Sequence, residues 1–309
     1  MTGSRVPGAE PGHRRDLVGG VLVALAAVLF GFVVVWGKQV LAGGMPVESM
    51  LALRFGTCAL IVAAVLLLLR RPMLAVPEER LGLALLALFG YAVEATLFFT
   101  AAQHGTAAAV TLLFFTYPVF VTLGSWAFGL GRPSSFTLLA LACALGGAAV
   151  VVATGAGLAI ETVGVVFALA TAVVYSGYLI GTDIVLKRTS PLTSAIWVSG
   201  GASLGLLVFS LLTGSWQMPS GPQMWWRILA MGVATAGAFV CLLAGIQRIG
   251  AVRTSIVSAL EPLAAAVLGY LVLGETVTAG VAVGGALILV GAVMASLGRV
   301  ATPQEQQIP

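Results

Sequence analysis

Three ionisable side chains, Arg54, Glu94 and Glu261, lie deep inside long apolar stretches of the sequence. A charge at the centre of a membrane-spanning helix costs at least about 2.5 kcal/mol, so such a residue is a functional candidate by default. A guanidinium suits carboxylates and other anions, whereas a carboxylate suits amines or proton exchange. These three residues are therefore the first candidates for a substrate site.

Arg54 and Glu94 fall at similar depths in consecutive predicted helices. With a rise of about 1.5 Å per residue, Arg54 lies about 10 Å and Glu94 about 13 Å from the outer end of its helix. We predict an ion pair, because pairing is the usual way in which buried charges are tolerated. The pair either pins the two helices together or lines the outer half of a solute pathway, and both interpretations stay open.

Glu261 directly precedes Pro262 near the middle of another predicted helix. Proline frees a backbone carbonyl, and irregular backbone at membrane depth is tolerated only against protein or a cavity. Glu261 is therefore the strongest candidate for a substrate-amine or proton site, the alternative being that it caps broken backbone or holds a neighbouring helix. Pro118 repeats this geometry with Tyr117 in place of the acid, where the ring could stack on a ligand or hydrogen-bond to it.

Lys38 lies near the end of the first predicted helix, from which its ammonium group can snorkel outward. A structural role is the simpler interpretation for Lys38, with a place on the wall of a binding site as the alternative. The remaining wall candidates are aromatic or hydroxyl-bearing residues within the apolar stretches: Trp36, Tyr91, Tyr175, Tyr178 and Ser258.

The composition predicts the environment of these residues. The chain has 309 residues, of which 60% are hydrophobic and 8% are charged, whereas a soluble domain carries about 25% charged residues. This excludes a soluble enzyme, a disordered chain and a disulfide-rich secreted domain. Barrel strands alternate apolar and polar residues, whereas residues 18–35 are apolar or glycine throughout. We expect an all-α integral membrane protein.

Turn residues and charges divide the chain into ten expected transmembrane helices between two tails, residues 1–16 and 299–309. A helix needs about 20 residues to cross about 30 Å of hydrocarbon, so ten helices use nearly the whole chain. The expected helices are 17–40, 47–69, 81–103, 106–130, 135–154, 162–186, 193–213, 224–247, 252–273 and 277–298. The sequence contains no phosphate-binding loop, suitably spaced catalytic carboxylates or metal-ligand cluster, so we expect no catalytic residue, cofactor or metal.

The Lys and Arg residues predict the orientation. With the amino terminus in the cytoplasm, twelve of them lie in cytoplasmic segments and two, Lys38 and Arg227, lie on the opposite side. Such an excess marks the cytoplasmic side. We expect a multi-pass protein of a bacterial-type inner membrane with both termini in the cytoplasm. The basic residues form small loop clusters, so no nucleic-acid partner is expected.

The two halves of the chain, 17–154 and 155–298, resemble each other. The clearest pair is residues 116–119 (Thr-Tyr-Pro-Val) and 260–263 (Leu-Glu-Pro-Leu). Other pairs at shifts of 144 or 145 residues are Gly19 with Gly164, Phe30 with Tyr175, Gly31 with Ser176, Pro46 with Pro191, Gln103 with Gln247 and Gly147 with Gly291. With five helices per half, the second half must enter the membrane from the opposite side, which predicts an inverted-topology repeat as in alternating-access carriers.

Residues 258–263 (Ser-Ala-Leu-Glu-Pro-Leu), followed by 273–275 (Leu-Gly-Glu), resemble the EamA branch of the drug/metabolite transporter superfamily. The first half departs from that pattern, with Tyr117 before the proline and Leu-Gly-Arg at 130–132. The resemblance implies a ten-helix carrier similar to bacterial exporters of aromatic or neutral amino acids, which works by alternating access around a central cavity. It also implies that the helix of Lys38 faces that cavity.

Other functions stay open at this point. The same class includes carriers of sugars or nucleoside-type solutes and exporters of cationic drugs. An integral-membrane enzyme is disfavoured because a lone mid-membrane acid lacks a second catalytic group, and a channel would require a continuous pore. The expected partners are a small-molecule substrate and the lipid bilayer. The spacing of Gly201 with Gly205 and of Gly280 with Gly284 suits close helix packing, either internal or in a homodimer.

The orientation can be tested with cysteines introduced in the predicted loops. Cysteines near Gly44 and Ser220 should react with an impermeant maleimide in intact cells, because these loops face outward. Cysteines near Arg71, Arg132 and Lys187 should react only after permeabilisation. The opposite labelling pattern would reverse the assignment of inner and outer ends.

Overall fold

The computed structural model describes residues 10–127, 135–155, 160–258 and 260–297. Every regular element in these ranges is a helix, and the extended backbone there is limited to one isolated bridge between Gly105 and Ile160. The all-helical prediction is therefore confirmed. Six of the described helices are long and apolar enough to cross a membrane, and four shorter apolar helices accompany them. The count of ten spans stays a prediction.

The helices of the first half follow the predicted spans closely, with two of those spans divided. Span 81–103 contains a π-helical turn, η2, and span 106–130 is broken between Phe114 and Tyr117. The elements are α1 (Glu10–Ala42), α2 (Val47–Leu68), η1 (Pro77–Glu79), α3 (Arg80–Leu85), η2 (Leu86–Ala92), α4 (Val93–Gln103), α5 (Ala107–Phe114), α6 (Tyr117–Ala127) and α7 (Ser135–Gly155).

The second half differs from the prediction at one predicted loop. Its elements are α8 (Thr162–Val185), α9 (Pro191–Leu212), α10 (Pro222–Ser258), α11 (Leu260–Leu268), η3 (Gly269–Leu273) and α12 (Ala279–Leu297). The break expected at 247–252 is wrong, because α10 continues to Ser258. That segment has no proline and one glycine, Gly250, and arginine is a good helix former.

The predicted turns begin and end helices where their residues have the right chemistry. Gly44 adopts a positive φ of 85° between α1 and α2, a conformation that costs glycine little. The Ser190 hydroxyl accepts a hydrogen bond from the Thr193 amide, and Pro191 occupies the first turn of α9. Both features are typical of a helix start.

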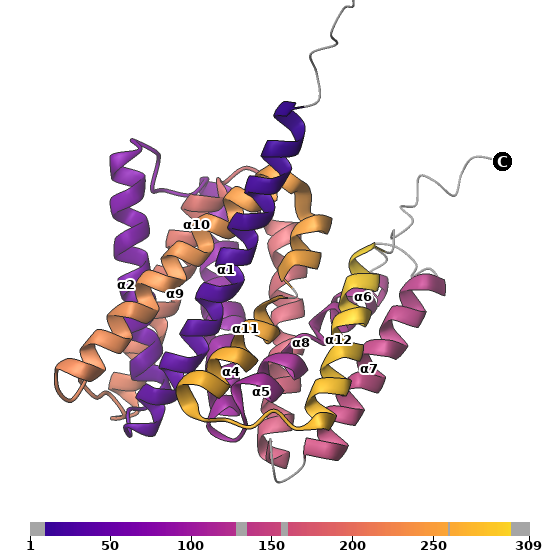
Figure 1. The fold of residues 1–309 in the computed structure, drawn as a ribbon. Helices are drawn as coiled ribbons and strands as arrows, with labels where there is room; N and C mark the ends of the chain where they lie inside the picture. The colour runs from indigo at the N-terminus through magenta and orange to yellow at the C-terminus, as the bar shows by residue number, and fades with distance from the viewer. Residues whose placement is uncertain (1–9, 128–134, 156–159, 259, 298–309) are drawn as a thin grey trace, which may run out of the picture.

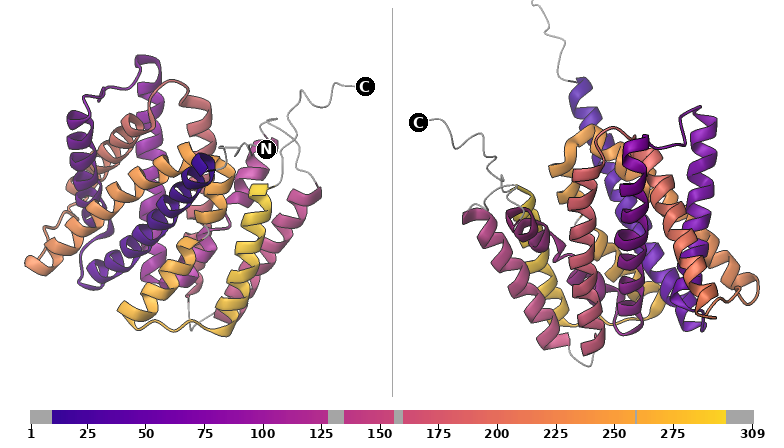
Figure 2. Two further views of the ribbon diagram at one scale, coloured as in Figure 1. Left: turned by 45° about the horizontal axis from the view of Figure 1, so that its top comes forward. Right: turned by 180° about the vertical axis from the view of Figure 1, so that it is seen from behind.

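The two halves interleave rather than forming separate bundles (Figure 1). α1 packs along α10, α2 along α9, α4 along α8 and α7 along α12. The amide of Glu161, just before α8, donates to the His104 carbonyl at 2.8 Å, which places the start of α8 beside the end of α4. The view from behind in Figure 2 shows the same arrangement, with α7 and α12 forming one flank.

Glycines allow this flank to pack at backbone contact. A Cβ atom at Gly284 of α12 would lie 2.6 Å from the Gly147 carbonyl oxygen, and one at Gly147 would lie 2.5 Å from the Gly284 carbonyl oxygen. Gly201 and Gly205 of α9 face Ala87 and Leu88 just as closely. Three glycines of the predicted small-residue motifs thus serve packing within the chain.

Glu79 joins two turns at the predicted cytoplasmic end, before the apolar part of its segment begins. Its carboxylate is 6% exposed and accepts the backbone N–H groups of Lys187, Arg188 and Thr189 at 2.8 to 2.9 Å. The Thr189 side chain and these amides hold the pKa of Glu79 at about 2, against an ordinary value of 4.5. The turn after α2 is thereby tied to the turn between α8 and α9.

We expect Glu79→Gln to lower the thermal unfolding temperature at pH 7, because glutamine cannot accept three amides as a carboxylate does. A carboxylate whose folded pKa is depressed stabilises the fold above its unfolded pKa and loses that effect as the pH falls. The difference between parent and variant should therefore shrink from about pH 4.5 downward. Thermal unfolding of both proteins from pH 3 to 7 measures this. Glu78→Gln, at an exposed neighbouring position, is the control, and an equal effect there would contradict the role of Glu79.

Candidate functional site

Arg54 is held in a defined position near the middle of the bundle. Only 5% of this α2 residue is exposed, and its Nε donates to the Thr235 hydroxyl of α10 at 3.0 Å. The guanidinium carbon lies 4.8 Å from the ring centroid of Phe55 and 5.6 Å from that of Phe99. Cation–π contacts of this kind are strongest where water is excluded. Two rings and one hydroxyl therefore orient the charge.

Close packing at α1 makes room for one of these rings. A Cβ atom at Gly37 would lie 2.0 Å from the Phe99 ring. Any larger residue at position 37 would displace Phe99 from beneath the guanidinium. The absence of a side chain on α1 thus helps to position a charge on α2.

The predicted ion pair between Arg54 and Glu94 is wrong as a direct contact. No nitrogen of Arg54 lies within 4.0 Å of a carboxylate oxygen of Glu94, although the two charges interact electrostatically. Thr235, Phe55 and Phe99 hold the guanidinium instead. Glu94 lies in the first turn of α4. The two groups interact electrostatically but do not share a hydrogen bond.

Glu261 reaches the same region from the other half of the chain. It is the second residue of α11, and Pro262 is buried next to it. Its carboxylate interacts electrostatically with Arg54, Glu94 and Tyr117. The structure thus brings together three charges that the sequence placed on separate helices.

Aromatic rings form a continuous wall beside these charges. Tyr91 lies on the π-helical turn η2, and its ring centroid is 5.5 Å from that of Tyr178 on α8. Tyr175 is 5.9 Å from Tyr178 and 5.0 Å from Tyr117 of α6. π-Helical turns occur frequently at functional sites. All four tyrosines predicted for the site therefore lie in one cluster.

A hydroxyl contact joins α8 to the start of α6 within this aromatic wall. The Ser176 hydroxyl of α8 lies 2.9 Å from the Tyr117 carbonyl, at the start of α6, and 2.6 Å from the Ala172 carbonyl of its own helix, so the two carbonyls share its proton. This contact secures the backbone where the helix is broken between α5 and α6. It also keeps Tyr117 beside Tyr175.

The charges in the site lack direct protein partners. Within the described residues, no group donates to the carboxylates of Glu94 or Glu261, and Arg54 uses only its Nε in a hydrogen bond. Thr111 Oγ1 is the only fully buried side-chain oxygen or nitrogen in the described ranges without a hydrogen-bond partner. The unpartnered atoms of Arg54, Glu94 and Glu261 therefore keep some accessible surface. Groups of both signs are thus available to a ligand.

The other three predicted site residues lie on α1 and at the last described residue of α10. Lys38 forms an ion pair with Glu275 at the end of α1. Trp36 stacks on Phe32 of its own helix, with ring centroids 5.1 Å apart. Ser258 is the last residue of α10.

Sequence reasoning missed Thr235 and the phenylalanines around Arg54. A hydroxyl near the middle of a predicted span was a signal for Thr235, because a buried guanidinium needs acceptors. Phe239 of α10 also joins the ring wall, 6.1 Å from Tyr91. No pattern in the sequence distinguishes these phenylalanines from ordinary core residues.

The fold and this site are those of a polytopic helical membrane protein with charged and aromatic groups collected between its two halves. The model of the EamA-like transporter family matches the chain twice, over residues 17–153 and 162–297. The chain therefore belongs to the EamA-like transporter family, as its sequence resemblance to that family predicts.

Curated relatives agree with this assignment. An uncharacterized transporter of Archaeoglobus fulgidus is 31% identical over 280 residues, which cover 90% of this chain and 96% of the relative. The uncharacterized transporter YwfM of Bacillus subtilis is 27% identical over 88% of this chain and 92% of its own length. A solved crystal structure with 21% identity covers 88% of this chain and 96% of its own, with a TM-score of 0.61, and shows a shared fold.

We expect Thr235→Val to destabilise the protein, because it leaves the Nε–H of a buried charge without its acceptor. The loss should be about 1 to 3 kcal/mol in the free energy of unfolding, measured on purified protein in detergent. Thr171→Val is the matched control: Thr171 is equally buried and likewise bonds a carbonyl of its own helix, but holds no charge. Equal losses would show that Thr235 does not anchor Arg54.

Proposed function

We propose that this protein exports small zwitterionic metabolites by alternating access, with amino acids bearing aromatic or neutral side chains as the preferred substrates. The observation that carries the proposal is the meeting of unpartnered charges of both signs beside a wall of tyrosine rings. An α-carboxylate complements the free guanidinium N–H groups of Arg54. An α-ammonium complements Glu94 or Glu261.

The magnitudes favour such a ligand. A hydrogen bond to a charged group contributes about 1.5 to 3 kcal/mol, and an aromatic pair adds about 0.5 to 1.5 kcal/mol beyond its buried area. Tyr91, Tyr175 and Tyr178 offer ring faces or edges to a side chain, while the charges hold its backbone groups. A neutral sugar would leave the buried charges without counter-charges, which disfavours it.

The architecture supports alternating access. The family model matches each half of the chain, and α8 begins at the end of the bundle where α1 finishes. This arrangement supports two halves that run in opposite directions, as an inverted repeat requires. A helix break lies beside Tyr117, and a π-helical turn carries Tyr91. Broken helices at the repeat interface are where carriers of this architecture bind their solutes.

The proposed location is a bacterial-type inner membrane with both termini in the cytoplasm. α1 begins and α12 ends at the same end of the bundle, which supports two termini on one side (Figure 1). The excess of Lys and Arg in the segments at that end supports the cytoplasmic assignment.

A second candidate is an exporter of organic cations. Two carboxylates face one guanidinium, so the site carries an excess of acidic groups. Tyrosine rings attract cations through their faces, by about 2 kcal/mol where water is excluded. A cationic ligand would use Glu94, Glu261 and the rings and would leave Arg54 aside.

Transport of charge-modified analogues separates these candidates. Proteoliposomes should carry phenylalanine, but phenylalanine methyl ester and phenylpropionate at least about tenfold less, because each lacks one charge-assisted hydrogen bond. We expect Glu261→Gln to keep the fold and to lose phenylalanine transport by a similar factor.

Glu78→Gln, on the exposed turn before α3, should transport phenylalanine like the parent protein. Faster transport of the methyl ester than of phenylalanine would favour the cation exporter. Unchanged transport by Glu261→Gln would show that this carboxylate is structural.

A further inference from the structure

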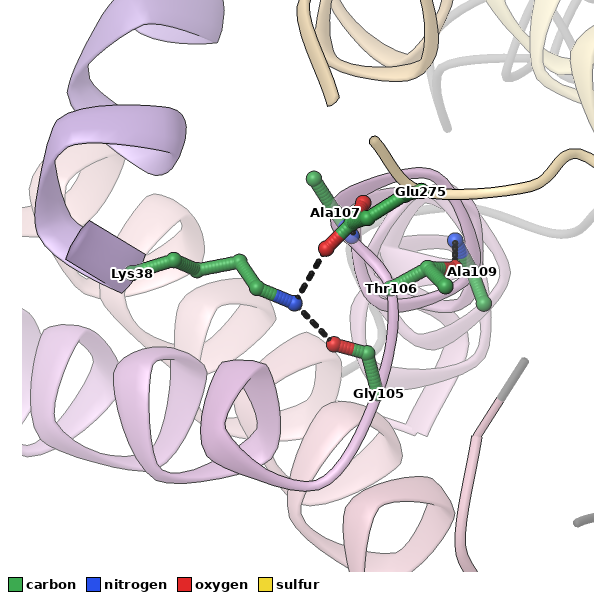
Figure 3. A network of polar contacts seen from close by, with 6 residues as sticks. All are labelled: Lys38, Gly105, Thr106, Ala107, Ala109 and Glu275. Carbon is green, nitrogen blue, oxygen red and sulfur yellow. Dashed lines mark hydrogen bonds and ion pairs between the residues drawn. The ribbon is translucent and has the colours of Figure 1, made fainter. Parts of the chain in front are cut away.

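A polar network joins three distant segments of the chain at the end of the bundle where α1 finishes (Figure 3). The Lys38 ammonium lies 2.6 Å from Glu275 Oε1 and also donates to the Gly105 carbonyl. Glu275 Oε2 accepts the backbone N–H of Ala107 at 2.7 Å. The side chains of Lys38 and Glu275 are only 16% and 14% exposed, so the pair is largely shielded from water.

Two glycines allow Glu275 to reach this position. Gly274 has a positive φ of 67° and ends η3, and the Glu275 amide then donates back to the Gly269 carbonyl at 3.2 Å. A Cβ atom at Gly269 would lie 2.7 Å from Glu275 Oε2. The residues 273–275, Leu-Gly-Glu, thus form a turn that folds the carboxylate back over its own helix.

The Glu275 carboxylate lies at the amino-terminal end of α5. Thr106 caps this helix by accepting the Ala109 amide at 3.2 Å, and Glu275 takes the amide of Ala107. A negative charge is favourable at a helix amino terminus. Glu275 is therefore held by a cation from one side and by a helix end from the other.

The network bridges the two halves and connects to the site. Lys38 and the turn at 104–106 belong to the first half, and Glu275 belongs to the second. Glu275 follows η3, which continues α11, and α11 begins with Glu261. α1 also packs along α11, where a Cβ atom at Gly31 would lie 3.1 Å from Ala264 Cβ. A displacement of α11 at the site would therefore pull on the pair.

We propose that the Lys38–Glu275 pair is a latch that closes this end of the bundle over the central site and that must open for solute to pass there. A shielded ion pair is costly to break by removing one partner, because the other charge stays buried. Opening to water hydrates both charges at once and avoids that cost. The pair therefore favours two states, closed and paired or open and hydrated, over intermediates.

The latch can be tested without any substrate. Cys58, Cys143 and Cys241 are replaced by serine, and Thr111→Cys, fully buried on α5 one turn beyond Ala107, serves as reporter. The purified protein in lipid nanodiscs is treated with a water-soluble maleimide. Glu275→Gln and Lys38→Gln should each raise the labelling rate about tenfold or more, the equivalent of one lost charge-assisted bond. Their combination should add little, because both remove the same pair.

Two controls keep the result specific. Glu161→Gln changes the exposed side-chain contact between Glu161 and His104 at the same end of the bundle and should leave labelling slow. Lys38→Arg keeps the positive charge and should also label slowly. Each variant must retain a cooperative melting transition; if Glu275→Gln loses it, Lys38→Gln decides, because it leaves the Ala107 contact in place.

Unchanged labelling in Lys38→Gln would overturn the latch, as would an equal rise in Glu161→Gln or in Lys38→Arg. Because the readout contains no solute, it is independent of the transport measurements. A protein that fails to carry phenylalanine can still show the latch, and a phenylalanine carrier can lack it.

Discussion

A charge inside an apolar bundle must be surrounded by groups that replace water, and this requirement shapes the middle of the protein. Arg54 obtains one hydroxyl from α10, one aromatic ring from α4 and a second ring from its own helix. Gly37 on α1 leaves the space that one of those rings fills. Four segments from both halves are therefore positioned around a single guanidinium, whose remaining N–H groups stay available for another anion.

Rigid and yielding parts of the fold are separated. α7 and α12 meet at backbone contact through Gly147 and Gly284, which leaves no freedom for sliding. The centre instead contains a break between α5 and α6 and a π-helical turn at Tyr91. Backbone irregularity thus lies beside the tyrosines, where a carrier needs to change shape, and regular packing lies on the flank.

Much of this arrangement is predictable from residue type and depth. Arg54, Glu94, Glu261 and the four tyrosines converge as their positions in apolar spans suggest, because buried polar groups seek one another. The hydrogen-bond partner of Arg54 was not predictable. The rotation of each helix about its axis decides whether Arg54 contacts Glu94 or Thr235. Helices that are apolar all round have weak sequence periodicity, so the sequence does not indicate this rotation. The pairing of Lys38 with Glu275 was not predictable either, because it depends on the turn at Gly274.

The interleaving of the halves has a consequence for how the chain is made. α1 packs along α10, which is synthesised about 200 residues later, a delay of about 10 to 40 s at ordinary translation rates. During that interval α1 lies in the bilayer without its main neighbour. It is the most apolar of the six long helices, whereas α10 is the least apolar. The helix that must wait is thus the one best suited to lipid, and the less apolar α10 is made when α1 is already present to pack against it.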